Sequence, residues 1–192
     1  MGTMEEYASF LAELVAGTRV GELGMQPNVL IIREKNLAEA EYVTLFTSVW
    51  EKCKERDAEE RQAVLIPHTY LSAAVQTGSL RIHLPLLLLQ KYREMGELAQ
   101  MQEVGVSVHS VDEAKQAEEL GASYITAGHI YPTDCKRGVP PRGMEFLEQV
   151  CESVKIPVYA IGGIHEENLS KIQVSSAAGA CMMSEYMISR YH

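Results

Sequence analysis

The chain has 192 residues, of which 46% are hydrophobic and 22% charged, and its formal net charge is −9. This composition indicates a globular protein with a substantial core and argues against a nucleic acid or an anionic membrane as partner, since like charges repel. The longest apolar run is too short to cross a bilayer, and the first residues lack a signal-peptide pattern. Four cysteines without a C-x-x-C pair favour reduced thiols in the cytoplasm over disulfides or a zinc site.

Helices are predicted where apolar residues recur three or four positions apart, and strands where short apolar runs end at Gly, Pro or charged residues. The chain opens on a helix at 4–16, and strands then alternate with helices. The seven predicted strands cover 29–32, 63–66, 80–84, 103–108, 123–127, 157–161 and 179–183. The helices between them cover 37–56, 69–76, 86–95, 110–120, 143–154 and 166–173, and Ser184 begins a short last helix.

These strands are continuous apolar runs rather than alternating ones, which is typical of a parallel sheet covered on both faces. Seven strands exceed the five or six of most doubly wound sheets, and neither a G-x-G-x-x-G motif nor a P-loop is present. The predicted fold is therefore α/β, a TIM (β/α)₈ barrel with one strand unaccounted for. No linker or repeat divides the chain, so residues 1–192 are expected to form a single domain.

In such a barrel the functional site lies at the carboxyl ends of the strands. Gly162 and Gly163 follow the penultimate strand, and Met183 and Ser184 follow the last one. Backbone N–H groups at a glycine pair and at a helix start bind phosphate oxygens, so these four residues are predicted to form a phosphate site. The alternative is that the glycine pair only makes a tight turn.

A second candidate is the loop that begins with His129 and carries Lys136, Arg137 and Arg142. A histidine at a strand end followed by clustered cations is typical of a site for an anionic ligand. Taken by itself, the same loop is more typical of a solvated connection.

Several motifs together resemble the thiamine phosphate synthase/TenI family. They are Arg33-Glu34-Lys35, the run from Gly105 to Ser110, the run from Gly128 to Thr133 with Lys136, and the run from Pro157 to Ile164. The resemblance implies a barrel that acts in thiamine biosynthesis on a thiazole phosphate. Because the family usually opens with a strand and ends on a longer helix, the first strand is expected to be absent or degenerate and the last helix shortened. We expect a dimer, or partial disorder, at these abbreviated ends.

The family has two known branches. The synthase branch couples a pyrimidine diphosphate to a thiazole phosphate and needs Mg²⁺, which acidic residues hold. Here the strands at 63–66 and 80–84 are followed by Pro67-His68 and by Pro85-Leu86, without carboxylates. The TenI-type branch resembles a thiazole tautomerase that moves a proton without metal or cofactor. The synthase branch usually has proline where this chain has His129.

The resemblance thus favours a tautomerase with His129 as general acid and base, because an imidazole titrates near neutral pH. It implies that Arg33, Lys35, His109, Thr133 and Lys136 bind the substrate. For Lys136 a solvated cation is an equal alternative. For Arg33 the equal alternative is a buried ion pair with Glu34 or another carboxylate. Two further functions stay open: a Mg²⁺-dependent synthase, and a non-catalytic thiazole-phosphate-binding or regulatory paralogue.

Overall fold

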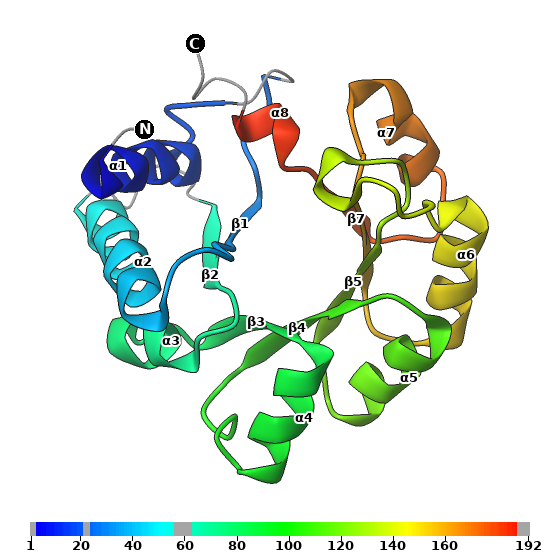
Figure 1. The fold of residues 1–192 in the computed structure, drawn as a ribbon, viewed down its shortest axis with the longest axis horizontal. Helices are drawn as coiled ribbons and strands as arrows, with labels where there is room; N and C mark the ends of the chain where they lie inside the picture. Colours follow the sequence, from blue (N-terminus) through cyan, green and yellow to red (C-terminus); the bar gives the residue numbers. More distant parts are fainter. Residues whose placement is uncertain (1–2, 21–23, 56–62, 188–192) are drawn as a thin grey trace. The chain divides into compact units, whose positions relative to one another are not determined.

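The computed structural model describes residues 3–20, 24–55 and 63–187, in which parallel strands alternate with helices (Figure 1). The predicted α/β class is therefore confirmed. These residues form two compact units. The first contains the described residues up to His83 together with Tyr186 and Met187, and the second contains Leu84–Glu185. Within the described residues, no helix is long and apolar enough to cross a membrane.

The first unit packs three helices beside two parallel strands (Figure 1). Its elements are α1 (Met4–Ala16), β1 (Val29–Ile32), α2 (Glu39–Lys54), β2 (Val64–Pro67) and α3 (Leu71–Thr77). β1 pairs with β2 in a register that places Val29 opposite Val64. The apolar faces of α1 and α2 supply most of the core, including Leu14, Leu45 and Phe46.

Helix α1 has a defined start and stop. Thr3 and Glu6 form a capping box, in which the Glu6 N–H donates to the Thr3 hydroxyl at 3.1 Å and the Glu6 carboxylate accepts from the Thr3 N–H at 2.6 Å. Gly17 ends the helix in the left-handed conformation, with φ of 71°. The predicted helix at 4–16 is confirmed with both bounds.

The buried Tyr42 hydroxyl joins the ends of β1 and β2. It donates to the Ile32 carbonyl at 2.7 Å and accepts from the His68 N–H at 2.7 Å. Burial raises the pKa of the Tyr42 phenol far above its ordinary value, so the hydroxyl keeps its proton. One side chain of α2 therefore forms a hydrogen bond with a backbone group at the end of each strand, the Ile32 carbonyl of β1 and the His68 N–H just after β2.

The second unit contains the greater part of a five-stranded parallel sheet, with strand order β3-β4-β5-β6-β7. The strands are β3 (Arg81–Pro85), β4 (Glu103–Val108), β5 (Tyr124–Gly128), β6 (Val158–Ile161) and β7 (Gly179–Cys181). The helices are α4 (Leu86–Glu94), α5 (Val111–Glu119), α6 (Gly143–Ser153), α7 (Glu166–Gln173) and α8 (Ser184–Met187). β3 and α8 contribute residues to both units.

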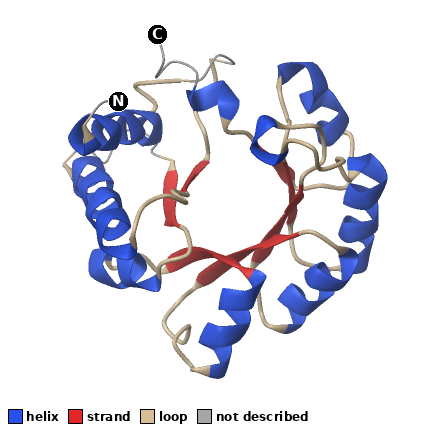
Figure 2. Ribbon diagram, viewed as in Figure 1, coloured by secondary structure: helices blue, strands red, loops and turns tan. Residues whose placement is uncertain are grey.

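Helices α5 and α6 pack against β4, β5 and β6 (Figure 2). β5 is buried along its whole length, as its continuous apolar sequence predicts. Helix α5 begins with Ser110 as N-cap, whose hydroxyl accepts from the Glu113 N–H at 3.0 Å. The Glu113 carboxylate accepts from the His109 N–H, one residue before the position that a capping box requires.

All seven predicted strands are confirmed. β1 and β4 keep the predicted bounds, β2, β3 and β5 begin and end one residue later, and β6 begins one residue later. β7 is shorter than predicted and covers three residues. Among the described residues no strand precedes β1, and α8 is described over four residues. The closure of a barrel and the single domain over residues 1–192 stay predictions.

Candidate functional site

His129 stands directly after the buried strand β5, at the start of a loop that runs to Arg142 (the His129 loop). The strand end beside it is crowded. A Cβ on Gly128 would lie 2.5 Å from the Ile161 carbonyl oxygen, and a Cβ on Gly162 would lie 2.3 Å from the Cβ of His129. Gly162 also has φ of 99°, which only glycine adopts readily. Glycine at both positions therefore lets the end of β6 pack against His129.

Two backbone hydrogen bonds hold this contact. The Ile130 N–H donates to the Ile161 carbonyl at 3.0 Å, and the Tyr131 N–H donates to the Gly162 carbonyl at 3.0 Å. A Cβ on Gly163 would lie 2.2 Å from the Pro132 carbonyl oxygen. The glycine pair therefore does more than make a tight turn, because it seats the first residues of the His129 loop.

The His129 ring is buried, with 4% of the residue exposed. Its Nε2 lies 3.3 Å from the Val139 carbonyl oxygen. Because a carbonyl oxygen only accepts, this contact requires the proton on Nε2. The Nδ1 atom is buried and has no hydrogen-bond partner among the described residues. In the neutral ring this nitrogen carries a lone pair, which can accept a proton.

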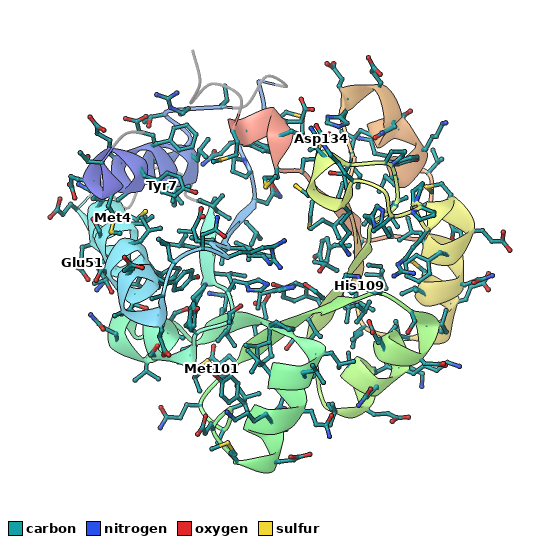
Figure 3. The ribbon with its side chains drawn as sticks, viewed as in Figure 1. Met4, Tyr7, Glu51, Met101, His109 and Asp134 are labelled. Carbon is teal, nitrogen blue, oxygen red and sulfur yellow. The ribbon has the colours of Figure 1, made fainter. Side chains whose placement is uncertain are left out.

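The Gly128 carbonyl, just before His129, accepts two side-chain hydrogen bonds. His109 Nδ1 approaches it at 2.9 Å and Arg142 Nε at 3.0 Å. The structure thus brings His109 to the peptide that precedes His129, and its predicted contact with the substrate stays a prediction. The His109 side chain acts here as an orienting donor. Figure 3 labels His109 and also Asp134, in the turn of the His129 loop.

The middle of the His129 loop forms a short 3₁₀ turn, η1 (Asp134–Lys136). The Thr133 hydroxyl accepts from the Cys135 N–H at 3.4 Å, so Thr133 caps this turn. Arg137 pairs with Asp134 at 3.0 Å, and both side chains are exposed, so the pair contributes little stability. Thr133 and Lys136 are half-buried. Both lie in the same loop as His129, and their predicted role in substrate binding stays a prediction.

The predicted phosphate residues lie at the ends of β6 and β7 and at the start of α8. Met183 is 61% exposed, and Ser184 is half-buried. Next to Ser184, the buried Glu185 carboxylate contacts Nδ1 of His165 at 2.5 Å. The Asn168 amide supports the same region, because it donates to the Gly163 carbonyl at 2.8 Å.

His165 is the N-cap residue of α7, and the Asn168 side chain, three residues on, satisfies its backbone N–H. The Asn168 side-chain oxygen accepts from the His165 N–H at 3.0 Å. The sequence contained the local signal for this bond, an Asn three residues after the N-cap position. The contact between His165 and Glu185 has no such signal, because 20 residues separate the pair.

Arg33 and Lys35 lie in the first unit, after β1, and both are exposed. The alternative of a buried ion pair between Arg33 and Glu34 is wrong, since Glu34 instead accepts a hydrogen bond from the Tyr7 hydroxyl. That bond joins α1 to the end of β1, and no local pattern in the sequence indicates it.

The first unit also holds a histidine pair that the sequence did not reveal. His68 and His83 form a bridge between parallel segments, and their rings stack with centroids 5.3 Å apart. Burial, together with the positive charge of Arg33, lowers the pKa of His68 to about 3. Burial, His68 and Arg33 lower the pKa of His83 to about 3 as well. Both imidazoles are therefore neutral at physiological pH.

The fold and these contacts define the class of the protein: a parallel α/β protein with a candidate site beyond the carboxyl ends of its strands. A model of the thiamine monophosphate synthase family matches residues 9–186. Thiamine-phosphate synthase 2 of Streptococcus pneumoniae serotype 4 is 31% identical over 182 residues, which are 93% of this chain and 80% of that protein. The chain therefore belongs to the thiamine monophosphate synthase family, whose enzymes act in thiamine biosynthesis.

Two archaeal relatives agree with this assignment. Thiamine-phosphate synthase of Pyrococcus horikoshii is 42% identical over 84 residues, which are 44% of this chain and 41% of that protein. The match thus spans less than half the length of that relative. The solved structure of thiamine phosphate pyrophosphorylase from Pyrococcus furiosus superposes with a TM-score of 0.70 at 26% identity, covering 92% of this chain and 79% of that one.

Proposed function

We propose that this protein is a metal-independent thiazole tautomerase that aromatises a thiazole carboxylate phosphate, with His129 as the group that moves the proton. The observation that carries the proposal is the state of the His129 ring. Its Nε2–H is donated to the Val139 carbonyl, and its Nδ1 is buried without a hydrogen-bond partner among the described residues. A nitrogen in this state is a base of fixed position.

In the proposed reaction, Nδ1 removes a proton from one carbon of the non-aromatic thiazole and the ring becomes positively charged. The same imidazolium then returns a proton to another position of the ligand, which leaves the thiazole aromatic. No atom is gained or lost in the cycle, and no electron acceptor is needed. The Val139 carbonyl lies against Nε2–H and stabilises the imidazolium between the two steps.

The anionic groups of the ligand need donors that do not compete for the proton. We assign the phosphate to backbone N–H groups of Gly162, Gly163, Met183 and Ser184, since glycine-rich turns and helix starts bind such oxygens. The Gly163 N–H has no hydrogen-bond partner among the described residues, which supports this role. The remaining substrate contacts are assigned to Lys136 and Thr133 in the His129 loop and to His109.

The names of the relatives favour a second function, thiamine phosphate synthase. As stated for the family, that reaction requires Mg²⁺, a hard cation that prefers carboxylate oxygens. In this chain the segments that end β2 and β3 carry Pro67-His68 and Pro85-Leu86, and the adjacent imidazoles of His68 and His83 are buried and neutral. These residues offer no carboxylate oxygen, so they do not fit Mg²⁺.

One assay separates the functions. The purified protein is incubated with the non-aromatic thiazole carboxylate phosphate, and formation of the aromatic product is followed with and without EDTA. The tautomerase proposal expects conversion that EDTA leaves unchanged. Coupling to a pyrimidine diphosphate that requires added Mg²⁺ would instead establish the synthase, and binding without either reaction would establish a non-catalytic paralogue.

The His129→Asn variant tests the residue. Asparagine keeps a polar side chain at the position but cannot exchange a proton near neutral pH, so we expect kcat to fall by about 10²–10⁴-fold. Thiazole phosphate should still bind with unchanged affinity in calorimetry. Normal turnover by His129→Asn would exclude His129 as the acid and base.

A further inference from the structure

We propose that the segment Val139-Pro-Pro-Arg142 braces His129, and that Arg142 is the positioning residue of this brace. The inference rests on the proposed function, because it concerns how the proposed base is held. It adds a role for four residues at the far end of the His129 loop. None of them needs to touch the ligand.

The segment contacts His129 at two places. The Val139 carbonyl accepts from Nε2 of the ring at 3.3 Å, and the Arg142 N–H donates to the His129 carbonyl at 3.0 Å. The first contact selects the tautomer, since only an Nε2–H can donate to a carbonyl. The second contact holds the backbone from which the ring projects. Ring and backbone of one residue are thus fixed by the same short segment.

The side chain of Arg142 extends the brace. Its Nε donates to the Gly128 carbonyl at 3.0 Å, and the adjacent Gly143 N–H donates to the Ile130 carbonyl at 3.1 Å. Three consecutive carbonyls around His129 therefore accept hydrogen bonds from two consecutive residues. The guanidinium also lies 5.5 Å from the centre of the Phe146 ring on α6, which anchors the arginine to a helix.

Pro140 and Pro141 connect the two contacts. Each proline has a restricted φ and no N–H, so the spacing between the Val139 carbonyl and the Arg142 N–H is stiff. This stiffness matters for the proton transfer. If the brace loosens, the ring can place its proton on Nδ1, and a nitrogen that already carries a proton cannot accept another from the ligand. We therefore expect the brace to act on the chemical step and not on ligand binding.

The test is the Arg142→Ala variant, compared with Arg93→Ala. Arg93 is a matched control, because its guanidinium also donates to a backbone carbonyl, that of Gly121 at 2.8 Å, on an exposed part of the second unit. For Arg142→Ala we expect kcat to fall about 10- to 100-fold with KM unchanged, as misplacement of a catalytic group does. Arg142→Lys keeps a donor at the position and should restore part of kcat.

A second measurement is independent of turnover. Nitrogen-15 NMR of the labelled imidazoles, with the His129 signals identified by their loss in His129→Asn, reports which ring nitrogen carries the proton. We expect the Nε2–H form in the wild type and in Arg93→Ala, and a mixture of tautomers in Arg142→Ala. If Arg142→Ala is poorly folded, the same spectra are taken on Arg142→Lys, for which we expect a smaller shift toward the mixture.

The outcomes separate the two proposals. An inactive wild-type protein with the expected tautomer shift would refute the tautomerase function and leave the brace standing. An unchanged tautomer and kcat in Arg142→Ala would overturn the brace, even if the wild type is active. An equal loss of kcat in Arg93→Ala would do the same, because it would assign the effect to general destabilisation.

Discussion

The stacked pair of His68 and His83 predicts how the stability of this protein depends on acid. Both residues are buried, with 4% and 2% of their surface exposed. Burial is the largest cause that lowers the pKa of each imidazole to about 3, from about 6.5 in an unfolded chain. Between these two pH values the unfolded chain binds more protons than the folded one, so stability falls as pH falls. Above pH 6.5 both states carry neutral histidines, and the effect disappears.

The magnitude follows from the difference in pKa. Below pH 6.5 each histidine lowers the free energy of unfolding by about 1.4 kcal/mol for every pH unit, until the pH reaches its pKa in the folded protein. Two pH units below the pKa of a histidine in the unfolded chain, the two residues together lower the free energy of unfolding by on the order of 5 kcal/mol. A typical domain has a total stability of about 5–15 kcal/mol, so this loss is a large fraction of it.

The assay is urea unfolding at a series of pH values from about 7.5 to 4.5, for the wild type and for His83→Phe. Phenylalanine keeps a ring that can stack on His68 and removes one titrating group. We therefore expect the loss of unfolding free energy over this interval to shrink by about 2–3 kcal/mol in the variant. Carboxylates titrate equally in both proteins, so they cancel in the comparison. Parallel pH profiles for the two proteins would refute this reasoning.

The remaining predictions concern close packing and a buried hydrogen bond. In Gly162→Ala the new methyl group would collide with the Cβ of His129, and the residue would have to adopt a positive φ. We therefore expect the free energy of unfolding, measured by thermal denaturation, to fall by about 2–4 kcal/mol. Gly138→Ala, also at positive φ but with no atom within 4 Å, should lose only about 1 kcal/mol, and equal losses would contradict the packing argument. Tyr42→Phe leaves the His68 N–H without its acceptor and should cost about 1–3 kcal/mol in urea unfolding; an unchanged midpoint would contradict that bond.

Local patterns in the sequence predicted most elements of the fold. The helix from Met4 to Ala16 and its end at Gly17 follow from helical periodicity and from a glycine that adopts the left-handed conformation. β4 was predicted with its observed bounds because it is a short apolar run that ends at a polar residue. Each of these signals lies within a few neighbouring residues, and they can therefore be read without knowledge of the rest of the chain.

The candidate site was predicted only in part. His129 and Gly162 stand at strand ends, and parallel strands bring such ends to one edge of a sheet, so their proximity could be anticipated. The sequence could not predict which ring nitrogen of His129 is free. The answer depends on the Val139 carbonyl, which lies ten residues further along a loop rich in Pro and Gly. Every residue has the same backbone carbonyl, so the residue types do not indicate which carbonyl accepts a given hydrogen bond.

The sequence by itself thus determined the order of helices and strands, the family motifs and the position of His129 after β5. Only the tertiary structure decided which residues meet: His68 with His83, Tyr7 with Glu34, and Arg142 with the Gly128 carbonyl. The physical reason is that secondary structure responds to local periodicity and caps, whereas burial, tautomer and pKa depend on neighbours that the chain brings together from distant positions.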